Sequence, residues 1–136
     1  MSWDAYLTDD RGHLEGDWNY THNCNGMANA VVREWPDASL YVERSAAWWD
    51  RRNCPELAER DRSEARISWW CALDGMDGPE GAAFLDRIIK ELEADPERFR
   101  KMNPPNGWGS FDTFVSVLRS MRDRVPEWPC TWSTSG

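Results

Sequence analysis

The chain has no long apolar run and relatively few basic residues. No segment approaches the roughly 20 consecutive apolar residues that a membrane-spanning helix requires. Lys and Arg number 16 against 24 Asp and Glu, which gives a net charge of -8. Binding to nucleic acid or to an anionic membrane requires a basic face, and this charge balance argues against one. We therefore expect neither a nucleic acid nor a membrane as a partner.

The common signatures of catalysis, phosphate binding and metal binding are also absent. The sequence contains no GxSxG, no GxxxxGK[ST] and no GxGxxG after a strand. It has only two histidines, and its four cysteines form no CxxC pair. These absences predict no metal site and no cofactor, and they leave catalysis unsupported.

The first ten residues, MSWDAYLTDD, lack the basic and apolar regions of a secretory signal. Disulfides persist mainly in exported proteins, so we expect a cytoplasmic protein with reduced thiols. Such thiols pack as small hydrophobic groups. The cysteines concerned are Cys24, Cys54, Cys71 and Cys130.

Strand-like alternation of apolar and polar side chains occurs at both ends of the 136-residue chain. Residues 2–7 and 129–134 alternate, and residues 17–21 are rich in β-forming side chains. Strands this short are unstable alone, so we expect the first and last to pair. The length suits one domain, residues 1–136. The predicted fold is α+β, a mainly helical single domain with a small antiparallel sheet pairing the N- and C-terminal strands.

Helical periodicity dominates the residues between the predicted strands. Proline near helix starts, glycine after helix ends and a Ser110 cap set the expected boundaries. Residues 36–53 are ambiguous, because they fit either a short strand at 40–42 or a helix around 46–49. The predicted helices cover residues 27–35, 55–74, 78–92, 96–102 and 111–125.

Polar residues gather just before the first predicted helix, in the run NYTHNCN. Free N–H groups and the positive end of the helix dipole can hold a carboxylate, a phosphate or a carbonyl oxygen there. Among these residues, Thr21, His22 and Asn23 are candidate ligand-binding residues, and His22 would add a donor, an acceptor or a proton carrier. The alternative is structural: Thr21, Asn23 or Asn25 caps the helix, and His22 bonds to the backbone.

A second polar segment, NPPNGWG at residues 103–109, has two prolines and two glycines and therefore predicts a defined loop. Glycines flank Trp108, and the Asn103 and Asn106 amides offer directed donors and acceptors. The loop fits the wall of a pocket in which Trp108 stacks on a flat ligand. The alternative is a structural turn whose tryptophan fills the core.

The most unusual feature of the composition is its ten tryptophans. Two adjacent pairs occur, Trp48-Trp49 and Trp69-Trp70. Neighbouring helical positions point about 100° apart, so we expect at least one ring of each pair to be half exposed. Exposed tryptophan often anchors a partner, which makes these four residues candidate interaction residues. The alternative is an unusually aromatic core.

The two polar segments resemble the signatures of a family of small, uncharacterised bacterial and phage proteins. One signature is Thr-His-Asn-x-x-x-Met-Ala, matched at residues 21–28. The other is Asp-Pro-x-x-Phe followed by Asn-Pro-x-Asn-Gly-Trp-Gly, matched at residues 95–109. The resemblance implies that both segments belong to one folded unit and meet in space. It implies no reaction, and it does not extend to the tryptophan-rich residues 35–70.

We expect the two segments to form one pocket, lined by Thr21, His22, Asn23, Asn103, Asn106 and Trp108. The main hypothesis is a non-catalytic phage or bacterial accessory protein. It would bind a flat polar small molecule and sequester a nucleotide-type signal. The alternative is an acidic, tryptophan-rich module that binds or inhibits a host protein. A third hypothesis is an enzyme with His22 as acid or base.

Overall fold

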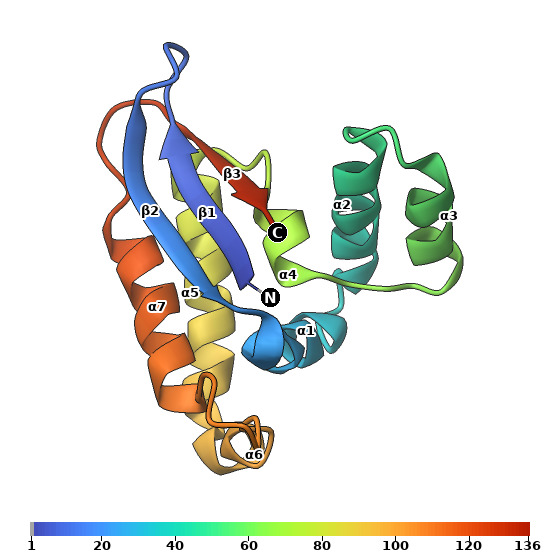
Figure 1. The fold of residues 1–136 in the computed structure, drawn as a ribbon, viewed down its shortest axis with the longest axis vertical. Coiled ribbons are helices and arrows are strands. Elements are labelled where there is room, and N and C mark those ends of the chain that lie inside the picture. Colours follow the sequence, from blue (N-terminus) through green and yellow to red (C-terminus); the bar gives the residue numbers. More distant parts are fainter. Residues whose placement is uncertain (1) are drawn as a thin grey trace.

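The structure, a computed structural model, describes residues 2–136 and is a single α+β fold. Its three-stranded antiparallel sheet has the order β2-β1-β3, formed by β1 (Ser2–Thr8), β2 (Leu14–Thr21) and β3 (Thr131–Ser135). Residues from the two ends of the chain pair directly, with Ala5 opposite Thr134 in register. The two termini consequently lie side by side (Figure 1). The predicted pairing of the N- and C-terminal strands is confirmed.

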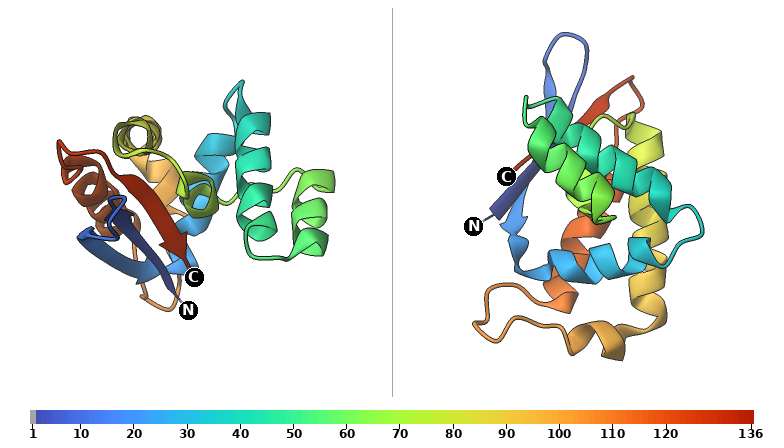
Figure 2. Two further views of the ribbon diagram at one scale, coloured as in Figure 1. Left: turned by 90° about the horizontal axis from the view of Figure 1, so that it is seen from above. Right: turned by 90° about the vertical axis from the view of Figure 1, so that its right-hand side faces the viewer.

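Helices cover one face of the sheet and extend beyond its β3 side. The long helices α5 and α7 lie across the inner face, while α2 and α3 form an antiparallel pair beyond α4 (Figures 1 and 2). In the described residues, no helix has both the length and the apolar character needed to cross a membrane. The helical elements are η1 (His22–Cys24), α1 (Asn25–Arg33), α2 (Ala38–Asp50), α3 (Pro55–Ser63), α4 (Trp69–Leu73), α5 (Gly78–Ala94), α6 (Pro96–Arg100) and α7 (Phe111–Asp123).

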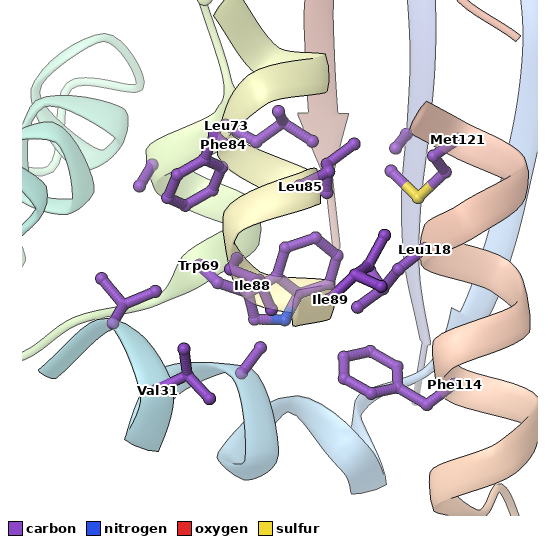
Figure 3. Packing of buried hydrophobic residues seen from close by; sticks show 14 of the residues in the cluster. Val31, Trp69, Leu73, Phe84, Leu85, Ile88, Ile89, Phe114, Leu118 and Met121 are labelled. Carbon is purple, nitrogen blue, oxygen red and sulfur yellow. The ribbon is translucent and has the colours of Figure 1, made fainter. Parts of the chain in front are cut away.

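The core lies between the sheet and the two long helices. Alternation in β1 turns Trp3, Ala5 and Leu7 inward, and all three are fully buried. They meet the apolar stripes of α5 and α7, including Leu85 and Phe114 (Figure 3). The opposite face of the sheet carries polar side chains such as Asp4, Tyr6 and Asn19. One face of the sheet is therefore apolar and packed, and the other is polar.

Local capping sets the starts of the two long helices as the sequence predicts. The Ser110 hydroxyl accepts from the Thr113 N–H, and the Thr113 side chain accepts from the Ser110 N–H, which completes a capping box. The Asp77 carboxylate accepts from the Glu80 N–H at 2.7 Å at the start of α5. At the first helix, by contrast, the side chain of Thr21 caps η1, and α1 has no side-chain cap.

The middle of the chain resolves one open alternative and differs from the prediction in one place. Residues 38–50 form helix α2, so the helical alternative holds and no short strand exists at 40–42. The predicted helix over residues 55–74 is wrong, because the chain leaves the helix after Ser63 and restarts only at Trp69. Ala65 has a positive φ of 51°, which ends the helical path. Contacts from other helices then hold the new start: Ser45 accepts from the Ser68 N–H, and Asn29 from the Trp69 N–H.

Candidate functional site

An open hollow of about 660 Å³ lies at one end of β2, beside the loop that carries Trp108. Four of the six predicted ligand-binding residues line it: Thr21, Asn23, Asn106 and Trp108. The two polar segments identified in the sequence therefore meet in space. The other lining residues are Ser2, Asn19, Tyr20 and Gly109.

Backbone geometry holds the Trp108 loop against the end of β2. The Asn23 amide donates to the Trp108 carbonyl at 3.2 Å. Gly109 has a φ of +89°, and a Cβ there would lie 2.8 Å from Thr21 Cγ2 and 3.0 Å from Cys24 Sγ. Only glycine fits both this conformation and this close approach. The loop is thus locked to the first polar segment by a hydrogen bond and by direct packing.

The Trp108 ring projects into solvent and does not fill the core. It is 71% exposed, the most exposed large hydrophobic side chain in residues 2–136. The alternative of a structural turn with a core tryptophan is therefore wrong. The ring offers a flat apolar face and an N–H donor beside the hollow.

Three asparagine amides in the hollow are each fixed at one end by an internal hydrogen bond. The Asn19 Nδ2 donates to the Asp4 carboxylate at 2.8 Å, and the Asn23 Nδ2 donates to the Trp108 carbonyl. The Asn106 Oδ1 accepts from the Trp108 N–H at 3.0 Å. Each partner is purely a donor or purely an acceptor, so it determines which way the amide points. Acceptor oxygens of Asn19 and Asn23 and the donor nitrogen of Asn106 are left for a ligand.

The lining of the hollow is electrically neutral. It contains no Lys, Arg, Asp or Glu side chain. Among the described residues, no cationic side chain lines the hollow to neutralise a phosphate or carboxylate, and two of the fixed amides present oxygens that repel an anion. The free groups of the hollow are thus mainly acceptors, which complement hydroxyl or amino donors.

His22 lies outside the hollow, contrary to the expectation from the sequence. Its ring packs against Trp70, with 5.5 Å between the ring centroids. Its Nδ1 lies 2.9 Å from the Asn25 amide nitrogen, and the Asn25 Oδ1 accepts from the Trp69 indole at 2.9 Å. Because an indole N–H only donates, this chain of bonds makes Nδ1 an acceptor and leaves the ring proton on Nε2. His22 is thus turned toward Trp69 and Trp70 by Asn25.

Asn103 also lies outside the hollow, because it holds the start of the last helix. Its Oδ1 accepts from the Phe111 N–H at 2.7 Å. This bond satisfies one of the free N–H groups at the start of α7. Asn103 therefore supports the loop from its far end and does not face a ligand.

The paired tryptophans have the geometry expected of helical neighbours. Trp48 and Trp69 are buried, whereas Trp49 and Trp70 are half-buried. The indole of Trp49 donates to the buried carboxylate of Asp61 at 3.0 Å, which ties α3 to α2. The paired tryptophans therefore belong largely to an aromatic core, as the alternative interpretation proposed. Trp108, by contrast, is exposed to solvent.

The thiols and the tyrosine near the hollow are packed groups. Burial raises the pKa of the Cys24 thiol, which lies beneath Gly109. Burial also raises the pKa of Tyr20, whose hydroxyl lies 2.6 Å from the Thr113 hydroxyl. Raised pKa values keep both groups protonated at neutral pH, so neither is an activated nucleophile.

Strand alternation could have identified one lining residue that the motif analysis missed. Asn19 follows the inward-facing Trp18, so its side chain must lie on the open face of the sheet. Ser2 gave no sequence signal, because its place in the hollow depends on its pairing with Thr21.

The search for similar proteins gives no functional guide. No protein-family model, no curated protein and no solved structure matches this chain.

Proposed function

We propose that this protein is a non-catalytic binding protein that takes a flat, polar small molecule at Trp108. The observation that carries the proposal is the 71% exposed indole beside a hollow lined by amides of fixed orientation. Aromatic stacking accepts any flat ring, while the Asn19, Asn23 and Asn106 amides select for its hydrogen-bonding edge. The resemblance to small bacterial and phage proteins fits a compact accessory protein that sequesters its ligand.

The neutral lining narrows the class of ligand. A nucleoside carries a flat base and donor hydroxyl and amino groups, and it matches the free acceptors of Asn19 and Asn23. A nucleotide adds phosphate charge that no side chain of the hollow neutralises. Among nucleotide-type signals, we therefore expect the uncharged members to bind at least as tightly as the phosphorylated ones.

The test is isothermal titration with adenosine, guanosine, cytidine and their 5′-monophosphates. We expect at least one nucleoside to bind, and Trp108→Ala to weaken that binding by at least about tenfold, the usual contribution of a stacked base. Asn106→Ala removes one donor and should weaken binding by a smaller factor. Leu14→Ala, which removes an exposed apolar side chain away from the hollow, is the matched control and should change nothing. Failure of every compound to bind below millimolar concentration would refute the proposal.

The alternative function, an interaction surface made by the paired tryptophans, has weaker support. Trp48 and Trp69 are buried, and the indole of Trp49 is occupied by Asp61. A partner protein would find only parts of the Trp49 and Trp70 rings at the surface. Loss of a captured host protein in Trp49→Ala, with ligand binding intact, would favour this alternative.

A further inference from the structure

The outer edge of β3 is closed by the chain itself. The Trp132 N–H donates to the Met76 carbonyl at 2.8 Å, and the Gly75 N–H donates to the Trp132 carbonyl at 2.9 Å. The Thr134 N–H donates to the Asp74 carboxylate at 2.8 Å. The segment after α4 therefore occupies the hydrogen-bonding positions that another strand would use.

These bonds also determine which main-chain groups of β2 face outward. The N–H and C=O groups of Trp132 point away from β1, so Trp132 and its partner Leu7 share no main-chain hydrogen bond. The N–H and C=O groups of Leu7 must therefore point toward β2. Main-chain direction alternates along a strand, so the N–H and C=O groups of Ala5 and Trp3 also point toward β2, where Trp3 pairs with Tyr20. The intervening β2 residue Asn19 therefore points its N–H and C=O away from the sheet. The same alternation turns the main-chain groups of Asp17 outward.

Nothing in residues 2–136 closes this second edge. No main-chain or side-chain hydrogen bond to the outward N–H or C=O groups of Asp17 and Asn19 occurs among those residues. β2 is eight residues long, and both side chains are exposed. An unpaired strand edge of this kind is a template for a further strand.

The charge of the sheet indicates what kind of strand would fit. None of the three strands contains Lys or Arg, whereas β1 and β2 carry Asp4, Glu15 and Asp17. None of these three carboxylates forms an ion pair within the described chain. Outside the sheet, by contrast, several carboxylates do pair with Arg side chains. Asp4 and Asp17 lie on the open face and form an acidic surface there, with no counterion among residues 2–136.

We propose that the outer edge of β2 binds an extended, basic peptide segment as an added antiparallel strand. The main-chain groups of Asp17 and Asn19 would supply the hydrogen bonds, and the carboxylates of Asp4 and Asp17 would attract Lys or Arg side chains on the open face. A second copy of this chain does not fit this edge, because none of its strands carries a Lys or Arg to pair with these carboxylates. This site adjoins the hollow at Asn19, but it uses main-chain groups and carboxylates and does not need Trp108, so its failure and the failure of the small-molecule function are distinguishable.

Antiparallel pairing predicts which peptide amides matter. A peptide residue directly opposite Asn19 exchanges both main-chain hydrogen bonds with it and places its side chain on the same, open face. In a peptide alternating Lys and Val, the Lys residues take these positions because their side chains face Asp4 and Asp17. The amides of Lys therefore point to β2, and the amides of Val point to solvent.

The test is titration of the full chain with three forms of this Lys-Val peptide. The first is unmodified, the second is methylated on the main-chain nitrogens of the Lys residues, and the third is methylated on the main-chain nitrogens of the Val residues. We expect micromolar binding of the first form, loss of at least about tenfold on methylation at Lys, and no change on methylation at Val. Equal binding of all three forms would refute strand addition, and loss on methylation at Val alone would refute the antiparallel register.

Variants of the protein test the charge and the edge separately. Asp17→Lys should weaken the unmodified peptide by about tenfold, while Glu91→Lys, the same charge change on exposed α5 surface, should leave it within about twofold. Asn19→Pro removes one outward N–H and no main-chain hydrogen bond to β1, but it also removes the side-chain bond to Asp4. Asn19→Ala removes only the side-chain bond and is the control, so Asn19→Pro should weaken peptide binding more than Asn19→Ala while the circular dichroism spectrum is retained. Trp108→Ala should weaken nucleoside binding by at least about tenfold and spare peptide binding. Peptide binding that is insensitive to Asp17→Lys would overturn the assignment.

Discussion

The two edges of the sheet differ in what covers them. On the β3 side, the segment after α4 bonds to the strand, and the Thr134 carbonyl also accepts from the Trp48 indole and from Arg52 at 2.9 Å. On the β2 side, the outward main-chain groups and three amides have unused hydrogen-bonding capacity beside an exposed indole. Residues of similar type therefore stabilise the fold on one side and are available for recognition on the other.

The number of tryptophans is therefore a poor guide to function in this chain. Trp132 is 1% exposed and lies against Trp18 and the backbone of Gly81, where a Cβ would come too close to its ring. Trp108 has the same side chain and makes no comparable contact. Position relative to the sheet, and not residue type, separates a core residue from a candidate binding residue.

The largest expected effect is on the β3 side. Trp132→Ala should lower the free energy of unfolding by about 3–5 kcal/mol, because it leaves a large cavity and an unpaired Gly78 carbonyl, which now accepts from the indole. Trp108→Ala, its counterpart at the β2 side, should change that free energy by less than about 0.5 kcal/mol. Urea denaturation of both variants measures the contrast, and equal losses would contradict it.

A smaller effect is expected from opening the β3 edge without making a cavity. Asp74→Ala removes the acceptor of the Thr134 N–H and the partner of Arg51, at 2.7 Å. Since Thr134 is fully buried, its unpaired N–H should cost about 1–3 kcal/mol. Asp17→Ala at the open edge of β2 should leave the melting temperature unchanged. A fall for both variants would mean that the β2 edge is also structurally required.

The smallest expected effect is on the reactivity of the cysteine thiols, which measures how easily the structure opens locally on the β3 side and on the β2 side of the sheet. Burial raises the pKa of Cys71, in α4 beside β3, to about 12, and raises the pKa of Cys24 below the hollow. Cys54 is half-buried at the start of α3, whereas Cys24 and Cys71 are buried, so Cys54 should react first with a thiol reagent because it is the most accessible of the three. Cys24 should follow and Cys71 should be last. Mass spectrometry of the labelled peptides gives the order, and Cys71 reacting before Cys24 would reverse the comparison.

Much of the fold could be predicted from the sequence because its signals are local. Alternation in residues 2–7 and 129–134, the apolar stripes of α5 and α7, and the Ser110 cap each depend on neighbours within a few residues. The break after Ser63 depends instead on Asn29 and Ser45, which lie far away in the sequence. The pattern of apolar residues within 55–74 does not predict those contacts.

The candidate site was only partly predictable for the same reason. The sequence indicates that residues around Asn23 and Trp108 form defined polar turns, and the structure brings them together. The direction of His22 is decided by Asn25 and Trp69, which are separated by 44 positions. Motif spacing carries no information about that contact.

The amino-acid sequence alone determined the acidic charge, the helical and strand periods, the glycine positions of the Trp108 loop and the absence of basic residues from the strands, because these are properties of composition and of short segments. Only the tertiary structure decided which indole stands in solvent, which way each amide points and which sheet edge is closed. Those outcomes depend on contacts between distant segments, such as Asn23 with Trp108 and Trp48 with Thr134. Such contacts form only when the whole chain packs around one core.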